Sequence, residues 1–173
     1  MSEVGSVAQR YSHLIGQEMV FTGTEEVGRA SIRKFALAIG DLNPLYVNRE
    51  QAASGPYGDV VAPPTFVCET TQYHRGLVDE EGGFSDRMHL EVEGQVLRGS
   101  NEYTFHQLLR PDDVITARWR VRDIYERRGR TGHLLFIAID ITYTNQDGEL
   151  LAENHEITVH RLDEPTVGTS GAT

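Results

Sequence analysis

The second half of the chain alternates between apolar and polar residues, and this pattern most constrains what the chain can form. The alternation is clear from Ile115 to Val121 and again from Leu135 to Ile141. A period of two places every second side chain on the buried face of a β-sheet. Asp147-Gly148 is a strong hairpin signal between two such runs. We therefore predict long antiparallel strands, over about 88–105, 115–122, 135–141 and 150–161.

Glycines interrupt the first of these strands. Gly94 lies within it, and Gly99-Ser100 breaks the alternation before Tyr103 and Phe105 resume it. Either interruption marks a β-bulge or a close approach of two backbones.

The first part of the chain carries helical patterns instead. Ile32, Phe35, Ala36 and Ile39 have the i, i+3, i+4, i+7 spacing of an amphipathic helix, and Gly40 is a helix stop. Asn48 with Gln51 forms a capping box for a short helix, and Pro64 suits the first turn of another. The predicted helices cover 29–39, 49–53 and 64–73, and a strand and a short helix are expected near 19–27 and 7–15.

These elements indicate an α+β fold, in which a bent antiparallel sheet packs on a helix. Residues 1–162 are expected to form a single domain, and 163–173, rich in Gly, Thr and Ser, a disordered tail. The helix held by the sheet is expected to be either 29–39 or 64–73. Because such a sheet has edge strands to protect, we expect a dimer.

Composition excludes several classes of partner. The net charge of -10 argues against nucleic acid and against an anionic membrane surface. No apolar run approaches the roughly 20 residues of a membrane helix, and no signal peptide is visible, so we expect a cytoplasmic protein. Cys68 is the only cysteine, and no His or carboxylate pair has metal-ligand spacing. We expect neither a metal nor a cofactor.

The stretch Gly40-Asp41-Leu42-Asn43-Pro44-Leu45-Tyr46 follows the first long helix directly. Asn43 precedes a proline, which favours an extended or turned backbone at that point. A carboxylate on a rigid turn at a helix end suits proton chemistry. Asp and Asn also favour turns for purely local reasons, so the pattern by itself leaves both interpretations open.

The same stretch, from Ala38 to Asn48, resembles the signature of the MaoC-like hotdog-fold hydratases and dehydratases. The resemblance continues at Tyr57-Gly58, at Val61–Phe66, at Arg98–Tyr103 and at Arg110–Asp113, so it covers nearly the whole chain except the tail. It implies a hotdog fold, a bent antiparallel sheet wrapped around a central helix. The nearest variant is the MaoC dehydratase N-terminal type, similar to the substrate-binding subunits of two-subunit dehydratases.

What the resemblance implies is a (3R)-hydroxyacyl-thioester dehydratase or enoyl-thioester hydratase, a hydro-lyase acting on acyl groups carried by coenzyme A or acyl carrier protein. The catalytic Asp of the family matches Asp41, and the Asn that orients the site matches Asn43. The substrate would bind near Gly58, Ala62, Pro64 and Thr65.

Two departures from the family pattern point to an incomplete site. The catalytic His is replaced by Tyr46, and a phenol with a pKa near 10 is a poor base at neutral pH. In the family, a glycine at the start of the central helix often uses its N–H to polarise the thioester carbonyl, and Pro64 lies near the position of that glycine. Because proline has no N–H, the amide of Thr65 would have to replace it. The chain therefore looks like the half of a hydratase pair that relies on a partner hotdog for the His.

Alternatives remain. A self-sufficient homodimer would use Asp41 with Tyr46 or with a histidine such as His74 or His106, and a non-catalytic module would only bind the acyl thioester. The basic run Arg127–Arg130, expected at a hairpin tip, suits the phosphates of coenzyme A or simply solvent. The sequence does not give the chain length of the acyl group, the carrier, the pathway, or whether the dimer is homo- or heteromeric.

Overall fold

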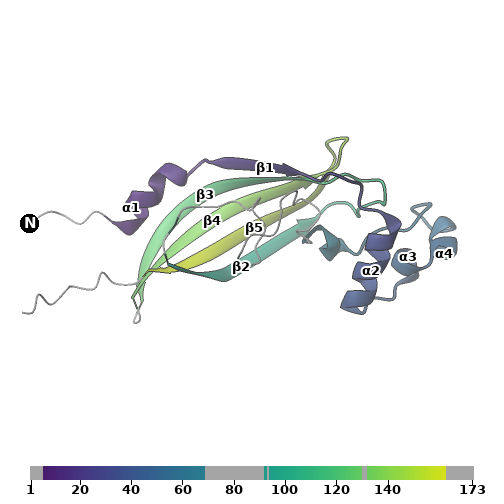
Figure 1. Cartoon of the computed structure of the whole chain (residues 1–173), viewed down its shortest axis with the longest axis horizontal. Helices are drawn as coiled ribbons and strands as arrows, with labels where there is room; N and C mark the ends of the chain where they lie inside the picture. The colour runs from purple at the N-terminus through teal and green to yellow at the C-terminus, as the bar shows by residue number, and fades with distance from the viewer. Residues whose placement is uncertain (1–5, 69–91, 93, 130–131, 163–173) are drawn as a thin grey trace, which may run out of the picture.

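A computed structural model describes residues 6–68, 92, 94–129 and 132–162 of the chain (Figure 1). The elements in chain order are α1 (Val7–Tyr11), the 3-10 helix η1 (Ser12–Leu14), β1 (Glu18–Thr22), α2 (Arg29–Ile39), α3 (Pro44–Val47), α4 (Arg49–Ala53), the 3-10 helix η2 (Pro64–Cys68), β2 (Gln95–Phe105), β3 (Thr116–Gly129), β4 (Gly132–Thr144) and β5 (Leu150–Leu162).

The strands of the described residues form one antiparallel five-stranded sheet in the order β1-β3-β4-β5-β2. The pairing of β2 with β5 shifts register between Arg98 and Ser100. A Cβ on Gly99 would lie 2.8 Å from the carbonyl oxygen of Ile157. The predicted bulge is confirmed, and glycine is required there because β5 runs too close for a side chain.

The sheet has one apolar face and one charged face, as the alternation predicts. Ala117, Val121 and Ile137 are fully buried on the inner, concave face. On the outer face, Arg118 and Arg120 lie beside Glu18, and Arg122 lies beside Asp140. A sheet with a single apolar face needs cover on that side only, as in an α+β fold.

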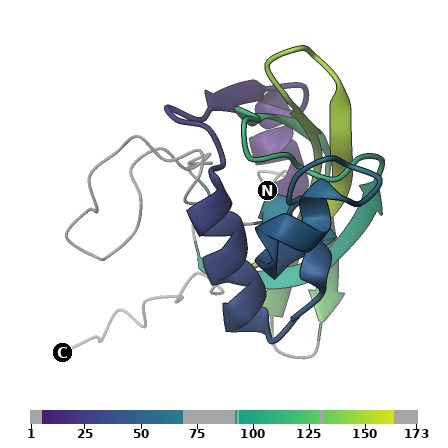
Figure 2. The ribbon, with the colours of Figure 1, turned by 90° about the vertical axis from the view of Figure 1, so that its right-hand side faces the viewer.

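The helices α2, α3 and α4 gather beyond one end of the sheet (Figures 1 and 2). Since α2 lies outside the curve of the sheet, it is not the central helix, and one of the two positions predicted for that helix is wrong. The segment that begins at Pro64 enters the core instead, because Phe66 and Val67 are buried. Phe66 meets Phe35 of α2 edge to face, with ring centroids 5.1 Å apart.

Several expectations fall outside the described residues: the continuation of the helix to Tyr73, the residue His74 and the tail 163–173. None of the described helices combines the length and apolar character needed to span a membrane.

One further local prediction is corrected, and another is confirmed. Ile39 ends the apolar spacing of α2, yet its side chain is 50% exposed, and the buried residues of this helix are Ile32 and Ala36. Arg127 and Arg128 lie next to the end of the β3–β4 hairpin, as predicted, because Gly129 of β3 pairs with Gly132 of β4. The guanidinium of Arg127 packs over the rings of Tyr125 and Phe136. An arginine held on aromatic rings is an ordinary surface arrangement, so these contacts do not mark a phosphate site.

Candidate functional site

The end of α2 fixes the position of Asp41. Gly40 adopts a left-handed conformation with φ of 76°, which a glycine reaches without strain. Its N–H donates to the carbonyl of Leu37, and the N–H of Asp41 donates to the carbonyl of Ala36 at 2.9 Å. This pair of hydrogen bonds is a Schellman motif. The backbone that carries the predicted catalytic carboxylate is therefore held rigidly.

Asp41 and Asn43 both hold the turn that follows. One carboxylate oxygen of Asp41 accepts a hydrogen bond from the N–H of Asn43 at 3.1 Å. The side-chain oxygen of Asn43 accepts from the N–H of Leu45 at 3.1 Å and so caps α3, where Pro44 takes the first position. The local, turn-forming role of these residues is thus real. Asp41 is half-buried, and its second oxygen accepts no hydrogen bond from the described residues.

The α3 helix carries Tyr46, and the charge of Asp41 acts on its phenol. The sequence-based prediction did not include this helix. Tyr46 is only 8% exposed. Burial raises the pKa of its phenol, and the charges of Asp41 and Tyr57 raise it further. The phenol is therefore protonated at neutral pH. It can donate a hydrogen bond to a neighbouring group, and it does not act as a base.

A second segment, residues 57–62, is joined to this motif by backbone hydrogen bonds. The N–H of Val61 donates to the carbonyl of Leu45 at 3.0 Å, and the N–H of Ala62 donates to the carbonyl of Leu109 at 2.8 Å. Ala62 is fully buried, so it can offer a ligand no amide donor. Gly58 is exposed, with φ of 73°.

The start of η2 lies next along this segment. Pro64 is partly buried, and Thr65 is exposed. The N–H of Phe66 donates to the carbonyl of Pro63 at 2.8 Å, whereas the Thr65 amide has no acceptor within the described part of the chain. Among the described residues, Thr65 therefore carries an amide at this helix start that no backbone carbonyl accepts.

An ion pair that sequence reasoning missed joins the two segments. The guanidinium of Arg29, at the start of α2, donates to both carboxylate oxygens of Asp59. These hydrogen bonds, together with one from the N–H of Val60, lower the pKa of Asp59 to about 2. The residues are 30 positions apart, and no sequence spacing links them.

No histidine of the described residues hydrogen-bonds to Asp41 or Tyr46. His106, considered as a replacement base, pairs with Glu153 of β5 at 2.9 Å instead. The structure therefore brings together Asp41, Asn43 and Tyr46, flanked by Tyr57, and supplies no imidazole among them.

Comparison with known proteins finds a dehydratase family and a probable hydratase subunit among the relatives of this chain. Residues 13–154 match the family described as FAS1-like, dehydratase domain region. A UPF0336 protein of Saccharopolyspora erythraea is 33% identical over 136 residues, covering 78% of this chain and 81% of that protein. A probable enoyl-CoA hydratase alpha subunit of Thermomonospora curvata is 32% identical over 138 residues, covering 75% of this chain and 43% of that protein.

Two solved structures from Mycobacterium tuberculosis share the architecture. In the ChsH1-ChsH2 complex, the matching chain has a TM-score of 0.67 at 19% identity, with 91% of this chain and 94% of that chain covered. The second is a C-terminally truncated HadBC complex, a (3R)-hydroxyacyl-ACP dehydratase. Its matching chain has a TM-score of 0.63 at 26% identity, with 84% of this chain and 96% of that chain covered. The predicted hotdog fold and the resemblance to MaoC-like proteins are confirmed.

Proposed function

The chain belongs to the FAS1-like dehydratase domain region family, and from that premise we propose that it is the half of a (3R)-hydroxyacyl-thioester dehydratase, or enoyl-thioester hydratase, that lacks the catalytic His. Its acyl substrate is carried on coenzyme A or acyl carrier protein. A second MaoC-like hotdog chain supplies the base.

The observation that carries this proposal is the buried, protonated phenol of Tyr46 beside Asp41. Hydration of an enoyl thioester needs a base that takes a proton from water, and dehydration needs the same group to return it. A phenol whose pKa is raised by burial and by a neighbouring carboxylate cannot do this near neutral pH. The carboxylate alone lacks the imidazole that the family uses.

The remaining groups suit a supporting role in the same reaction. The second oxygen of Asp41, which accepts no hydrogen bond from the described residues, can accept one from water or from a substrate hydroxyl, and the protonated phenol of Tyr46 can donate one. The open amide of Thr65 can donate to the thioester carbonyl oxygen, where negative charge develops. The segment 57–62, which leads to this amide, is anchored to α3 by the hydrogen bond from the N–H of Val61 to the carbonyl of Leu45.

The edge of the sheet supports a hotdog partner. Among the described strands β2 is outermost on its side and is 11 residues long. It exposes Val96, Leu97 and Phe105, at 56%, 46% and 40%. A long edge strand with exposed apolar side chains tends to pair with another strand unless a second chain already covers it. The similar ChsH1-ChsH2 and HadBC structures are complexes of two different chains.

The test is hydration of crotonyl-CoA, measured with the chain alone and with a co-expressed MaoC-like chain that carries His at the position of Tyr46. The proposal expects turnover by the pair and none by this chain alone. Turnover by the chain alone would show a self-sufficient homodimer. Binding of the thioester without turnover in both cases would show a non-catalytic binding module.

A further inference from the structure

The inner face of the sheet carries a set of polar side chains where β2 meets β5. This inner polar cluster consists of Arg98, Asn101 and Tyr103 of β2 with Asn154 and Glu156 of β5. Asn101 is paired with Glu156, and Tyr103 with Asn154, in the β2–β5 register. Asn154 is 1% exposed, and its neighbours on β4 are apolar and buried. Such residues break the apolar pattern of an inner face.

The cluster is only partly satisfied by its own hydrogen bonds. The amide nitrogen of Asn154 donates to the side-chain oxygen of Asn101 at 2.8 Å. The side-chain oxygen of Asn154 is buried and has no hydrogen-bond partner. A buried acceptor without a donor destabilises the fold, and in native proteins it commonly marks a site for a ligand or water.

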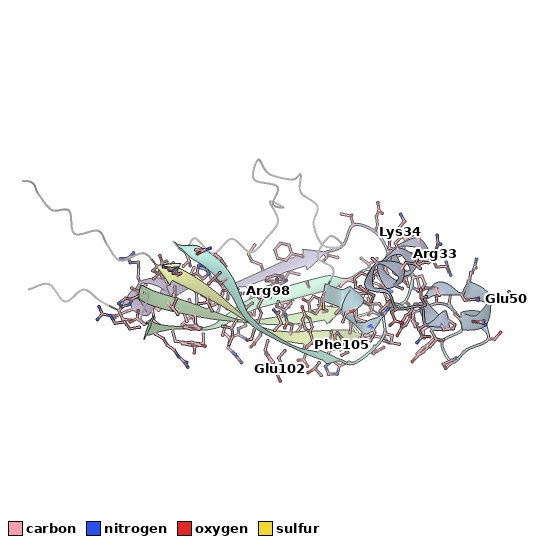
Figure 3. All side chains as sticks on the ribbon, turned by 90° about the horizontal axis from the view of Figure 1, so that it is seen from below. Arg33, Lys34, Glu50, Arg98, Glu102 and Phe105 are labelled. Carbon is pink, nitrogen blue, oxygen red and sulfur yellow. The ribbon has the colours of Figure 1, made fainter. Side chains whose placement is uncertain are left out.

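Glu156 adds a second acceptor to the same face. Burial raises the pKa of its carboxyl, and the positive charge of Arg98 opposes that shift. Figure 3 labels Arg98 and Glu102 on β2; the register puts Arg98 opposite Thr158 on the inner face and Glu102 opposite His155 on the outer face. The cluster thus combines two inward acceptors with one cation.

The η2 helix links the cluster to the candidate site. It begins at Pro64, three residues after the amide of Val61 that bonds to Leu45. It ends at Cys68, whose thiol hydrogen-bonds with the phenol of Tyr103. A group bound at the start of η2 that continues inward along this helix would meet Tyr103 and, beside it, Asn154.

We propose that the inner polar cluster binds a hydrogen-bond donor, such as a hydroxyl, carried on the acyl group away from the reacting carbons. This inference rests on the proposed thioester function and adds the class of acyl group to it. The donor would be shared between the free oxygen of Asn154 and the carboxylate of Glu156. An unsubstituted alkyl chain would leave both acceptors without a partner, which a polar site penalises strongly.

The experiment compares octanoyl-CoA with omega-hydroxyoctanoyl-CoA, titrated by calorimetry into the full-length chain assembled with its His-carrying MaoC-like partner. The wild-type chain should bind the hydroxylated thioester about tenfold more tightly. Asn154→Leu and Glu156→Met should each remove the preference while retaining affinity for octanoyl-CoA. Glu153→Gln, on the opposite face of β5, is the matched control and should keep the preference.

Three outcomes contradict the inference. Equal affinities in the wild-type chain overturn it while leaving the proposed function standing. If the preference for the hydroxylated thioester survives both inner-face substitutions, another site binds the hydroxyl. Absence of binding for both thioesters overturns the proposed function, and the inference with it. If Asn154→Leu does not fold, Glu156→Met still decides between these results.

Discussion

Burial of Tyr46 and the nearby charge of Asp41 both raise the pKa of the phenol, so the two side chains pair a negative charge with a hydroxyl that keeps its proton. Both are set by the same turn, which starts at Gly40 and is capped by Asn43. Among the described residues, the geometry provides a hydrogen-bond donor and a carboxylate acceptor, with no imidazole bonded to either. Under the proposed function, this relationship is what separates the chain from a self-sufficient hydratase.

Asp41→Asn should lower the activity of the reconstituted pair by about 100-fold or more, because the substituted amide carries no charge and accepts protons poorly. The fold should remain, since the Asn oxygen can still accept from the N–H of Asn43. Crotonyl-CoA hydration and the Tm are the measurements. Asp147→Asn, in the turn between β4 and β5, serves as control. Full activity in Asp41→Asn would remove this residue from the site.

Tyr46→Phe keeps the buried ring and removes the hydroxyl. If the phenol donates a hydrogen bond in the transition state, the pair should lose about 100-fold in kcat. Because the raised pKa keeps Tyr46 protonated throughout the neutral range, the shape of the pH profile should not change. A limb of the profile that disappears in Tyr46→Phe would show that the phenol titrates during catalysis, contrary to this account.

Asp59→Asn should weaken the link between α2 and the segment 57–62. The pKa of Asp59 is lowered to about 2 in the folded chain. Because the pKa of this carboxyl is lower in the folded chain than its ordinary value of 3.8, ionised Asp59 stabilises the fold at any pH above about 3.8. This stabilisation is lost as the pH falls through about 2. The Tm of the variant should therefore lie a few degrees below wild type at neutral pH. The two should converge in strong acid, and a constant difference would contradict the assignment.

Gly99→Ala should destabilise the fold by about 1–3 kcal/mol, because the added methyl would meet the Ile157 carbonyl and force β2 away from β5. Ser100→Ala, at the next and exposed position, should change stability by less than about 0.5 kcal/mol. Urea denaturation of both variants measures the difference. Equal stabilities would mean that the bulge does not constrain this edge of the sheet.

Most of the sheet could be predicted from the sequence, because apolar alternation along Ile115–Val121 and Leu135–Ile141 reports directly which face is buried. The α2 helix could also be predicted, to the residue, from its spacing and from Gly40. The role of Asn48 as a helix cap could also be predicted, and it is confirmed because its side-chain oxygen accepts a hydrogen bond from the N–H of Gln51.

The remaining features depend on contacts between distant residues. Local spacing says nothing of the Arg29–Asp59 pair or of the position of α2 beyond the end of the sheet. The short α3 helix was missed because a proline was interpreted as a break, when it occupies the first helical position. The burial of Tyr46, which gives it its chemistry, arises only after α3 packs against the rest.

The most direct test of the missing base is Tyr46→His, assayed for crotonyl-CoA hydration without any partner. The account predicts no turnover by the wild-type chain and measurable turnover by the variant, lost again when Asp41→Asn is added. Turnover by the unmodified chain alone would contradict it, and so would turnover by Tyr46→His that survives the addition of Asp41→Asn.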